Sequence, residues 1–312
     1  MKKFIDYLLL YLKGIAMGSA DVVPGVSGGT IAFITGIYEQ LLNSIKSVDG
    51  QALNYLRRFQ IKALWEHVNG TFLVVLLAGI ATSVITLAKV ITHLLSENPI
   101  QVWSFFFGLI VISALIILRE IKQWNFGVII AILVGIAAAY FITSSTPAET
   151  PEGKWFLFIA GAVAICAMIL PGISGAFILL LFGKYEYILG AIKEFKIADI
   201  LIFAAGCIVG LLSFARVVSW LFQKYHNLTV GVLSGFMIGS LYKVWPWKKA
   251  VETYIDRHGD IKPLYEVNVM PNDYLSQTGI EPHFIEALGF AAGGFLIVLA
   301  IDRLAAFLKP DH

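Results

Sequence analysis

The sequence predicts an all-α polytopic integral membrane protein with an inverted-topology repeat, in which two re-entrant or broken helical hairpins meet near the midplane. Of the 312 residues, 58% are apolar and 14% are charged, whereas soluble domains are about 45–50% apolar. The mean hydropathy is +0.79. Six apolar runs approach the roughly 17–25 residues of a membrane-spanning helix. A short interrupted segment also occurs twice at a constant offset.

The repeated segment carries a proline and several small residues inside an apolar stretch. Residues 22–46 read VVPGVSGGTIAFITGIYEQLLNSIK, and residues 169–193 read ILPGISGAFILLLFGKYEYILGAIK. The matching pairs are Pro24 and Pro171, Gly25 and Gly172, Ser27 and Ser174, Gly28 and Gly175, Gly36 and Gly183, Tyr38 and Tyr185, and Glu39 and Glu186. Backbone interrupted at membrane depth is tolerated only where it lines a cavity or is buried in protein. The repeat therefore marks the expected functional region.

The six runs extend the repeat beyond the interrupted segments. They lie at residues 71–95, 102–118, 126–142, 200–222, 228–244 and 284–308. With a second offset, Gly108 and Ser113 match Gly235 and Ser240. We expect one transmembrane domain over 1–312, with a first repeat at 1–145, a second repeat at 155–309, and an extracytoplasmic loop at 246–282.

The first twenty residues superficially resemble a signal peptide, with a basic pair followed by an apolar stretch. Asp6 and Lys13 interrupt that stretch, and Gly14 recurs in the second copy as Gly161. We therefore expect this segment to stay attached as part of the fold. The extra segment of the first copy, residues 50–69, mixes leucines with basic residues, which is typical of an amphipathic helix on the membrane surface.

The topology follows from the length of the interrupted helices. The ten residues from Ser27 to Gly36 rise about 1.5 Å each and cover roughly half of a 30 Å hydrocarbon core, which favours re-entry. A hairpin that returns to its starting side, followed by three spans, places the second copy upside down. Basic residues in the flanks favour cytoplasmic N- and C-termini. The first hairpin then enters from the cytoplasm and the second from outside.

The starts of the two short helices are the candidate phosphate site. A helix N-terminus with free amides attracts anions, and phosphate is a common occupant. The candidate phosphate-binding residues are Ser27, Gly28, Gly29 and Thr30 in the first copy, and Ser174 and Gly175 in the second. In the alternative interpretation these residues are only helix caps and packing glycines.

Lys89 and Arg216 are further candidate phosphate ligands, because they occupy equivalent positions near the ends of apolar helices. Charges there are costly unless they are paired or hydrated. In the inverted topology, each would meet a phosphate arriving from its own side of the membrane. The alternative is that both side chains snorkel to lipid headgroups.

Asp21 is the candidate for proton coupling. Its counterpart in the second copy is Met168, and a lone carboxylate beside the first break must pair with a cation or titrate. A purely structural pairing with a lysine is the alternative. Tyr38, Glu39, Tyr185 and Glu186 follow the short helices and are interpreted as a gate or as interfacial anchors.

Several classes of chemistry lack support in the sequence. The apolar runs contain no HExxH, CxxC or paired-histidine motif, so we expect no metal site and no cofactor. No Walker motif is present, which argues against direct use of ATP. Cys166 and Cys207 both lie in apolar stretches and imply no disulfide framework. The net charge of +2 gives no indication of a nucleic-acid partner.

The segments GSADVVPGVSGGT and LPGISGAFILLLFGKYEYIL resemble the bacterial polyprenyl-phosphate (undecaprenyl-phosphate) translocase family of the PopT type, and the similarity covers nearly the whole chain. The resemblance implies return of undecaprenyl phosphate from the outer to the inner leaflet of the bacterial plasma membrane for cell-envelope synthesis. It also implies a polyprenyl-phosphate lipid and membrane lipids as partners. The family motif falls on Asp21, Pro24, Gly25, Ser27, Gly28, Gly29 and Thr30, and on Pro171, Gly172, Ser174 and Gly175. Ala176 and Phe177 replace Gly29 and Thr30 in the second copy, so the two sites are unequal.

Two other functions stay open. Membrane-embedded polyprenyl-pyrophosphate phosphatases carry a similar PGxSRSG segment, but Gly28 and Gly175 stand where those enzymes have an arginine to clamp the transferred group. An ion or anion channel or exchanger built on re-entrant helices is the second alternative. Our expectation is a transporter that works by alternating access and is not an enzyme.

Overall fold

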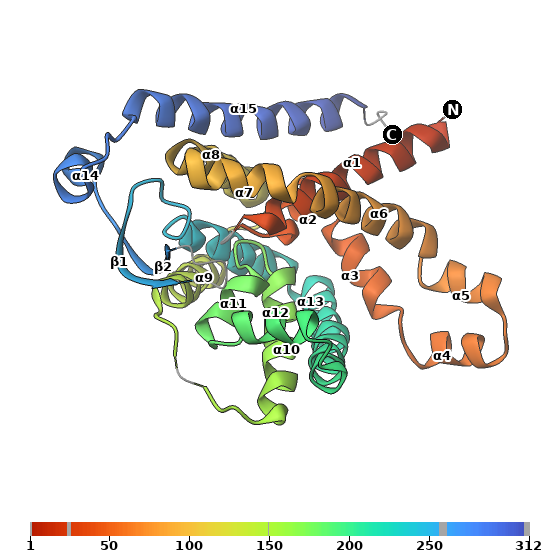
Figure 1. Ribbon diagram of the computed structural model, residues 1–312. Helices are drawn as coiled ribbons and strands as arrows, with labels where there is room; N and C mark the ends of the chain where they lie inside the picture. The colour runs from red at the N-terminus through yellow and green to blue at the C-terminus, as the bar shows by residue number, and fades with distance from the viewer. Residues whose placement is uncertain (1, 24–25, 149, 256–260, 309–312) are drawn as a thin grey trace.

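The computed structural model describes residues 2–23, 26–148, 150–255 and 261–308, and these residues are mostly helical (Figure 1). The first half contains α1 (Lys2–Val22), α2 (Gly28–Ile34), α3 (Tyr38–Lys46), α4 (Gly50–Arg57), α5 (Ile61–His67), α6 (Gly70–Thr86), α7 (Ala88–Glu97), α8 (Pro99–Leu118) and α9 (Phe126–Ser144). The second half contains α10 (Lys154–Ile169), α11 (Gly175–Leu181), α12 (Tyr185–Lys193), α13 (Ile197–Ser240), β1 (Lys248–Ile255), β2 (Ile261–Asn268), α14 (Pro271–Thr278) and α15 (Phe284–Leu308).

Several helices are long and apolar enough to cross a membrane. Among the described residues, α8, α9, α13 and α15 qualify by length and composition, and the number rises from four to six if the bent pairs α5–α6 and α11–α12 each count as one span. The prediction of a mostly helical, multi-pass membrane protein is confirmed. The inverted orientation of its two halves and the repeat boundaries stay predictions.

The predicted spans differ in continuity from the observed helices. The run at 71–95 is divided at Leu87 into α6 and α7. The runs at 200–222 and 228–244 are joined in α13, which is kinked where Tyr225 takes a non-helical backbone conformation (φ −134°, ψ 49°). The predicted surface segment forms α4 and α5, and α5 meets α6 at 70°. A change of direction from a surface helix to a spanning helix fits that angle.

The two interrupted segments fold in the same way. In each copy a long helix ends, a seven-residue helix follows (α2 or α11), and a glycine closes it. Those glycines, Gly36 and Gly183, have φ of +71° and +60°, a backbone region that only glycine adopts without strain. The chain then turns into α3 or α12, with α11 and α12 at 105°. Pro24 and Gly25 lie outside the described residues.

Glycines let the helices of each copy approach closely, as is common for membrane helices. A Cβ at Gly14 would meet the Leu76 carbonyl oxygen, so α1 lies directly on α6. In the second copy a Cβ at Gly161 would meet the Phe203 carbonyl oxygen, so α10 lies in the same way on the first half of α13. Each hairpin is therefore packed on the span that follows it.

The remaining spans pair across the two copies. Gly108 of α8 meets the Ala291 backbone of α15, and Gly294 of α15 meets the Phe105 carbonyl oxygen. Gly235 of α13 meets the Ile132 carbonyl oxygen of α9. Thus α8 packs on α15 and α9 packs on the second half of α13, so both halves of the chain contribute to each pair.

The predicted loop at 246–282 is folded. It contains β1 and β2, which pair antiparallel, followed by α14. Asn268 Nδ2 donates to the Tyr242 carbonyl oxygen at 2.7 Å, and Trp247 Nε1 donates to that of Pro282 at 2.7 Å. These bonds fix the sheet to the end of α13 and to the start of α15. In Figure 1 the β-hairpin and the α4–α5 pair lie at opposite sides of the molecule.

Candidate functional site

The two interrupted segments contact each other directly. The Ser27 hydroxyl donates to the Met168 carbonyl oxygen at 2.9 Å, and the Gly172 amide donates to Thr30 Oγ1 at 3.0 Å. The side chains of Ser27 and Thr30 are both fully buried. A Cβ at Gly29 would clash with the Ile169 carbonyl oxygen, so glycine permits the close approach. The start of α2 is therefore packed into the break between α10 and α11.

The first amides of α2 already have partners within the protein. The Gly28 amide donates to Asp21 Oδ1 at 2.7 Å, and the Gly29 amide donates to Ser27 Oγ at 3.0 Å. The Thr30 amide donates to the Ser27 carbonyl oxygen at 2.9 Å. The predicted free amides are thus occupied, and Asp21 supplies the anion at this helix N-terminus. No ion pair joins Asp21 to a basic residue among those described.

The start of α11 lacks the side-chain cap that the start of α2 has. Ser174 is its buried N-cap residue, but the Ser174 side chain makes no capping hydrogen bond. Met168 stands where the first copy has Asp21, and it brings no carboxylate. The two helix starts therefore differ in what neutralises their amides, and α11 is the one without an acidic partner at that position.

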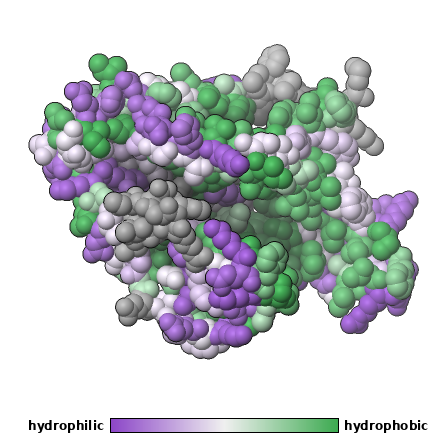
Figure 2. Space-filling model, in the orientation of Figure 1, coloured by the Kyte–Doolittle hydropathy of each residue, from purple (hydrophilic) through white to green (hydrophobic). Residues whose placement is uncertain are grey.

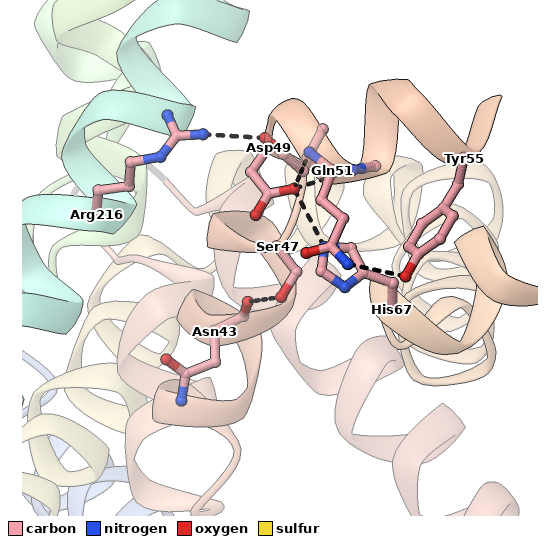
Figure 3. Close-up of polar contacts among 9 residues, drawn as sticks. Asn43, Ser47, Asp49, Gln51, Tyr55, His67 and Arg216 are labelled. Carbon is pink, nitrogen blue, oxygen red and sulfur yellow. Dashed lines mark hydrogen bonds and ion pairs between the residues drawn. The ribbon is translucent and has the colours of Figure 1, made fainter. Parts of the chain in front are cut away.

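Arg216 extends from α13 towards the residues that connect α3 to α4 (Figure 3). Its Nη2 donates to the Val48 carbonyl oxygen at 3.0 Å and its Nη1 to that of Leu212 at 3.2 Å. Next to Val48, Asp49 caps α4 and contacts His67 Nε2 at 3.1 Å. Arg216 thus fastens α13 to the corner between α3 and α4.

Lys89 is exposed on α7, and no hydrogen bond or ion pair involves it within the described part of the chain. The structure brings neither Lys89 nor Arg216 into contact with Ser27 or Ser174. Their role in binding phosphate stays a prediction.

The tyrosines and glutamates of the repeat lie in unequal surroundings. Tyr38 is 3% exposed and packs between Phe33 and Phe222, with ring centroids 4.9 Å and 5.9 Å away. Glu39 is exposed, and His226 Nε2 lies 3.8 Å from its Oε1. Tyr185 and Glu186 are half-buried at the start of α12. Tyr38 is therefore part of the core, whereas Glu39 faces the surface.

A groove between α3 and α13 was not predicted from the sequence. It is lined by Glu39, Leu42, Asn43, Ser219, Phe222 and Gln223. Figure 2 shows both hydrophobic and hydrophilic residues around the hollow near the centre of the molecule. Lys46 Nζ donates to Ser219 Oγ at 3.4 Å, and Ser219 Oγ donates to Asn43 Oδ1 at 3.0 Å. Of the lining residues, the sequence analysis had named Glu39, as a possible gate or interfacial anchor.

Grouped metal-ligating side chains would indicate a metal site. Within the described residues, no three His, Cys, Asp or Glu side chains are grouped so that they would hold a metal ion.

Comparison with known proteins identifies the family of this chain. A family model described as undecaprenyl phosphate translocase-like matches residues 17–262. The chain is 45% identical to a polyprenyl-phosphate transporter of Vibrio cholerae over 303 residues, which is 97% of this chain and 98% of that protein. It is 33% identical to a polyprenyl-phosphate transporter of Staphylococcus aureus, over 75% of this chain and 85% of that protein. No solved structure matches. The predicted family is confirmed, and the chain belongs to the undecaprenyl phosphate translocase-like family.

Proposed function

We propose that the protein carries undecaprenyl phosphate, or a closely similar polyprenyl phosphate, from the outer to the inner leaflet of the bacterial plasma membrane for reuse in envelope synthesis. Membership of the family and the names of both relatives support the substrate class. The observation that carries the proposal is the contact between the two interrupted segments through Ser27 and Thr30. In this proposal both termini are cytoplasmic.

To transport this lipid, the protein mainly has to shield the phosphate headgroup from the hydrocarbon core of the membrane. A phosphate is costly to place in hydrocarbon, whereas an isoprenoid tail stays in the bilayer throughout. Each hairpin offers the headgroup a half-site opening to one leaflet. In alternating access, the bonds from Ser27 to Met168 and from Gly172 to Thr30 break and re-form as the headgroup passes.

Asp21 provides a route to proton coupling. Its carboxylate holds the Gly28 amide, so it competes with a phosphate for the N-terminus of α2. A proton on Asp21 removes that competing charge and frees the amide for the headgroup. Loss of the proton expels the phosphate again. Uptake of one proton per cycle would give the transport a direction.

Hydrolysis fits the site less well. Phosphoryl transfer requires a cation that clamps the transferred group, and the residue after each motif serine is a glycine, Gly28 or Gly175. These glycines allow close packing but supply no charge. Ser27 is also fully buried and already donates to the Met168 carbonyl oxygen.

The test uses purified protein in liposomes with labelled polyprenyl phosphate in one leaflet. Leaflet exchange, phosphate release and ion flux are followed in the same preparation. We expect exchange that depends on protein, with no phosphate release and no ion flux without substrate. Absence of exchange would contradict the proposal, and release of phosphate from the pyrophosphate form would favour the phosphatase.

A further inference from the structure

Lys248, at the start of β1, has its ammonium group buried inside the protein. Its Nζ is buried and has no hydrogen-bond partner among the described residues. It lies 3.4 Å from the centroid of the Trp103 ring of α8. A cation over an indole ring is favourable, but such a contact does not replace the lost hydration of a buried charge. Burial is the main cause that lowers the pKa of Lys248 to about 7.

A second lysine lies close by. Lys243 follows α13, and its charge also contributes to the lowered pKa of Lys248. Its Nζ lies 4.7 Å from the centroid of the Phe177 ring of α11. The ammonium groups of Lys243 and Lys248 therefore each lie over an aromatic ring, one from α11 and one from α8. Neither forms an ion pair with a described carboxylate.

Lys243 also lines a pocket beside α11. The other lining residues are Thr143, Ser144, Ser145, Pro147, Phe177, Leu180, Leu181, Tyr242 and Glu266. Glu266 is the acidic side chain of the group, and its charge acts to raise the pKa of Lys248. Lys243 therefore brings a cation to the wall of this pocket. Lys248 does not line the pocket, but it is close enough for its pKa to respond to the charges of Lys243 and Glu266.

We propose that this pocket, with Lys243 and Lys248, is a docking site for a phosphate monoester on the β-hairpin side of the protein. The Lys243 ammonium group on the pocket wall can donate charge-assisted hydrogen bonds to a phosphate monoester, and the nearby charge of Lys248 adds to the attraction for the anion. The apolar residues of α11 on the pocket wall suit the first carbons of a prenyl chain.

The site deepens the proposed function and rests on it. In the proposed topology the β-hairpin is extracytoplasmic and the second hairpin opens to the same side. The pocket is then the place where a headgroup from the outer leaflet is first held, before it moves to the start of α11. Phe177 belongs both to α11 and to the surroundings of Lys243, so the two places are adjacent.

The experiment measures equilibrium binding to the full-length protein in nanodiscs. The probes are inorganic phosphate, a short-chain prenyl phosphate and the corresponding prenol. The variants are Lys248→Met and Lys243→Met, and the matched control is Lys249→Met, because the next residue of a strand points to the opposite face. Glu266→Gln removes the opposing charge.

We expect each pocket variant to weaken prenyl phosphate binding at least tenfold, the control to leave it unchanged, and Glu266→Gln to strengthen it. Binding of inorganic phosphate with the same lysine dependence identifies free phosphate as a second ligand, and binding of the prenyl phosphate alone identifies the lipid headgroup as the ligand. Failure of both probes to bind, or equal binding by wild type and both pocket variants, overturns the site.

Leaflet exchange by the same preparations separates the two proposals. If prenyl phosphate binding depends on the lysines but no leaflet exchange occurs, the transport function is contradicted and the proposed site is supported. If leaflet exchange is normal but prenyl phosphate binding does not depend on the lysines, the proposed site is contradicted and the transport function is supported.

Discussion

The Ser27 hydroxyl joins the two halves of the protein because it takes part in two bonds. Its oxygen accepts from the Gly29 amide and so caps α2, and its hydrogen goes to the Met168 carbonyl oxygen at the end of α10. The side chain is fully buried, so water cannot replace either bond. One atom therefore links helix capping to the contact between the repeated segments.

Replacing Ser27 with alanine tests that link. We expect the Ser27→Ala protein to lose about 1 kcal/mol of stability, the usual effect of removing a cap, and to exchange lipid several-fold more slowly. Thermal unfolding and liposome exchange measure the two effects. Ser96→Ala is the control, because Ser96 is exposed and bonds only to the His93 carbonyl oxygen within its own helix. Unchanged exchange by Ser27→Ala would contradict a role in transport.

Asp21→Asn separates the charge of this residue from its position. The asparagine side chain keeps an oxygen that accepts from the Gly28 amide, but it neither ionises nor takes up a proton. We expect leaflet exchange by the wild type to change with pH as Asp21 titrates, and exchange by the variant to lack that change. Equal pH profiles for the two proteins would refute proton coupling through Asp21.

Lys248 should make stability depend on pH. Its folded pKa of about 7 is below the usual 10.5, so between these values the unfolded chain binds one more proton than the folded protein. The contribution of Lys248 to the free energy of unfolding therefore rises as the pH increases from about 7 towards 10.5. Lys248→Met should remove the rise and melt at a higher temperature than wild type at neutral pH. Thermal unfolding across that range, with Lys249→Met as the control, checks the sign.

At the scale of elements, Arg216 couples a spanning helix to the surface helices. Its contact with Val48 holds the corner at which α3 leads into α4 (Figure 3). We expect Arg216→Ala to increase amide hydrogen exchange in residues 49–67, while Arg58→Ala, at the exposed C-cap of α4, leaves residues outside that helix end unchanged. Prenyl phosphate affinity measured on the same proteins shows whether Arg216 also binds the headgroup. Unaltered exchange in 49–67 would contradict the fastening role.

The sequence predicted most helical elements because apolar runs and glycines act locally. The turns at Gly36 and Gly183 and the surface helices α4 and α5 are examples. The kink at Tyr225 and the β-hairpin were not predicted. The hairpin depends on docking, through Trp247 and Asn268, against residues distant in sequence. The local pattern of apolar residues and glycines does not indicate contacts between residues that are distant in sequence.

The same distinction applies to the candidate site. The repeat located the residues that meet at the tips, but the sequence suggested that their amides were free. Only the folded backbone shows that Asp21 reaches Gly28, since the chain must first turn back between α1 and α2. Likewise, the positions of Lys243 and Lys248 against aromatic rings depend on how α8, α11 and β1 pack together.

For the whole molecule, the relation of the two halves to the membrane is the main prediction. In Figure 1 the α4–α5 pair and the β-hairpin lie at opposite sides of the molecule, and the inverted topology predicts that these sides face the cytoplasm and the exterior. In a variant with Cys166 and Cys207 replaced by alanine, we expect Arg58→Cys to react only with reagents that reach the cytoplasm. Lys249→Cys should react with impermeant reagents from outside. Reaction of both from one side would refute the inverted topology.

The pairing of α8 with α15, and of α9 with the second half of α13, has a consequence for biogenesis. The ribosome makes α8 and α9 before their packing partners, α15 and the second half of α13. A nascent chain stopped after α9 would expose the glycine faces of α8 and α9 to lipid or to insertion chaperones. Two fragments divided between α9 and α10 should consequently accumulate only when they are produced together in one cell.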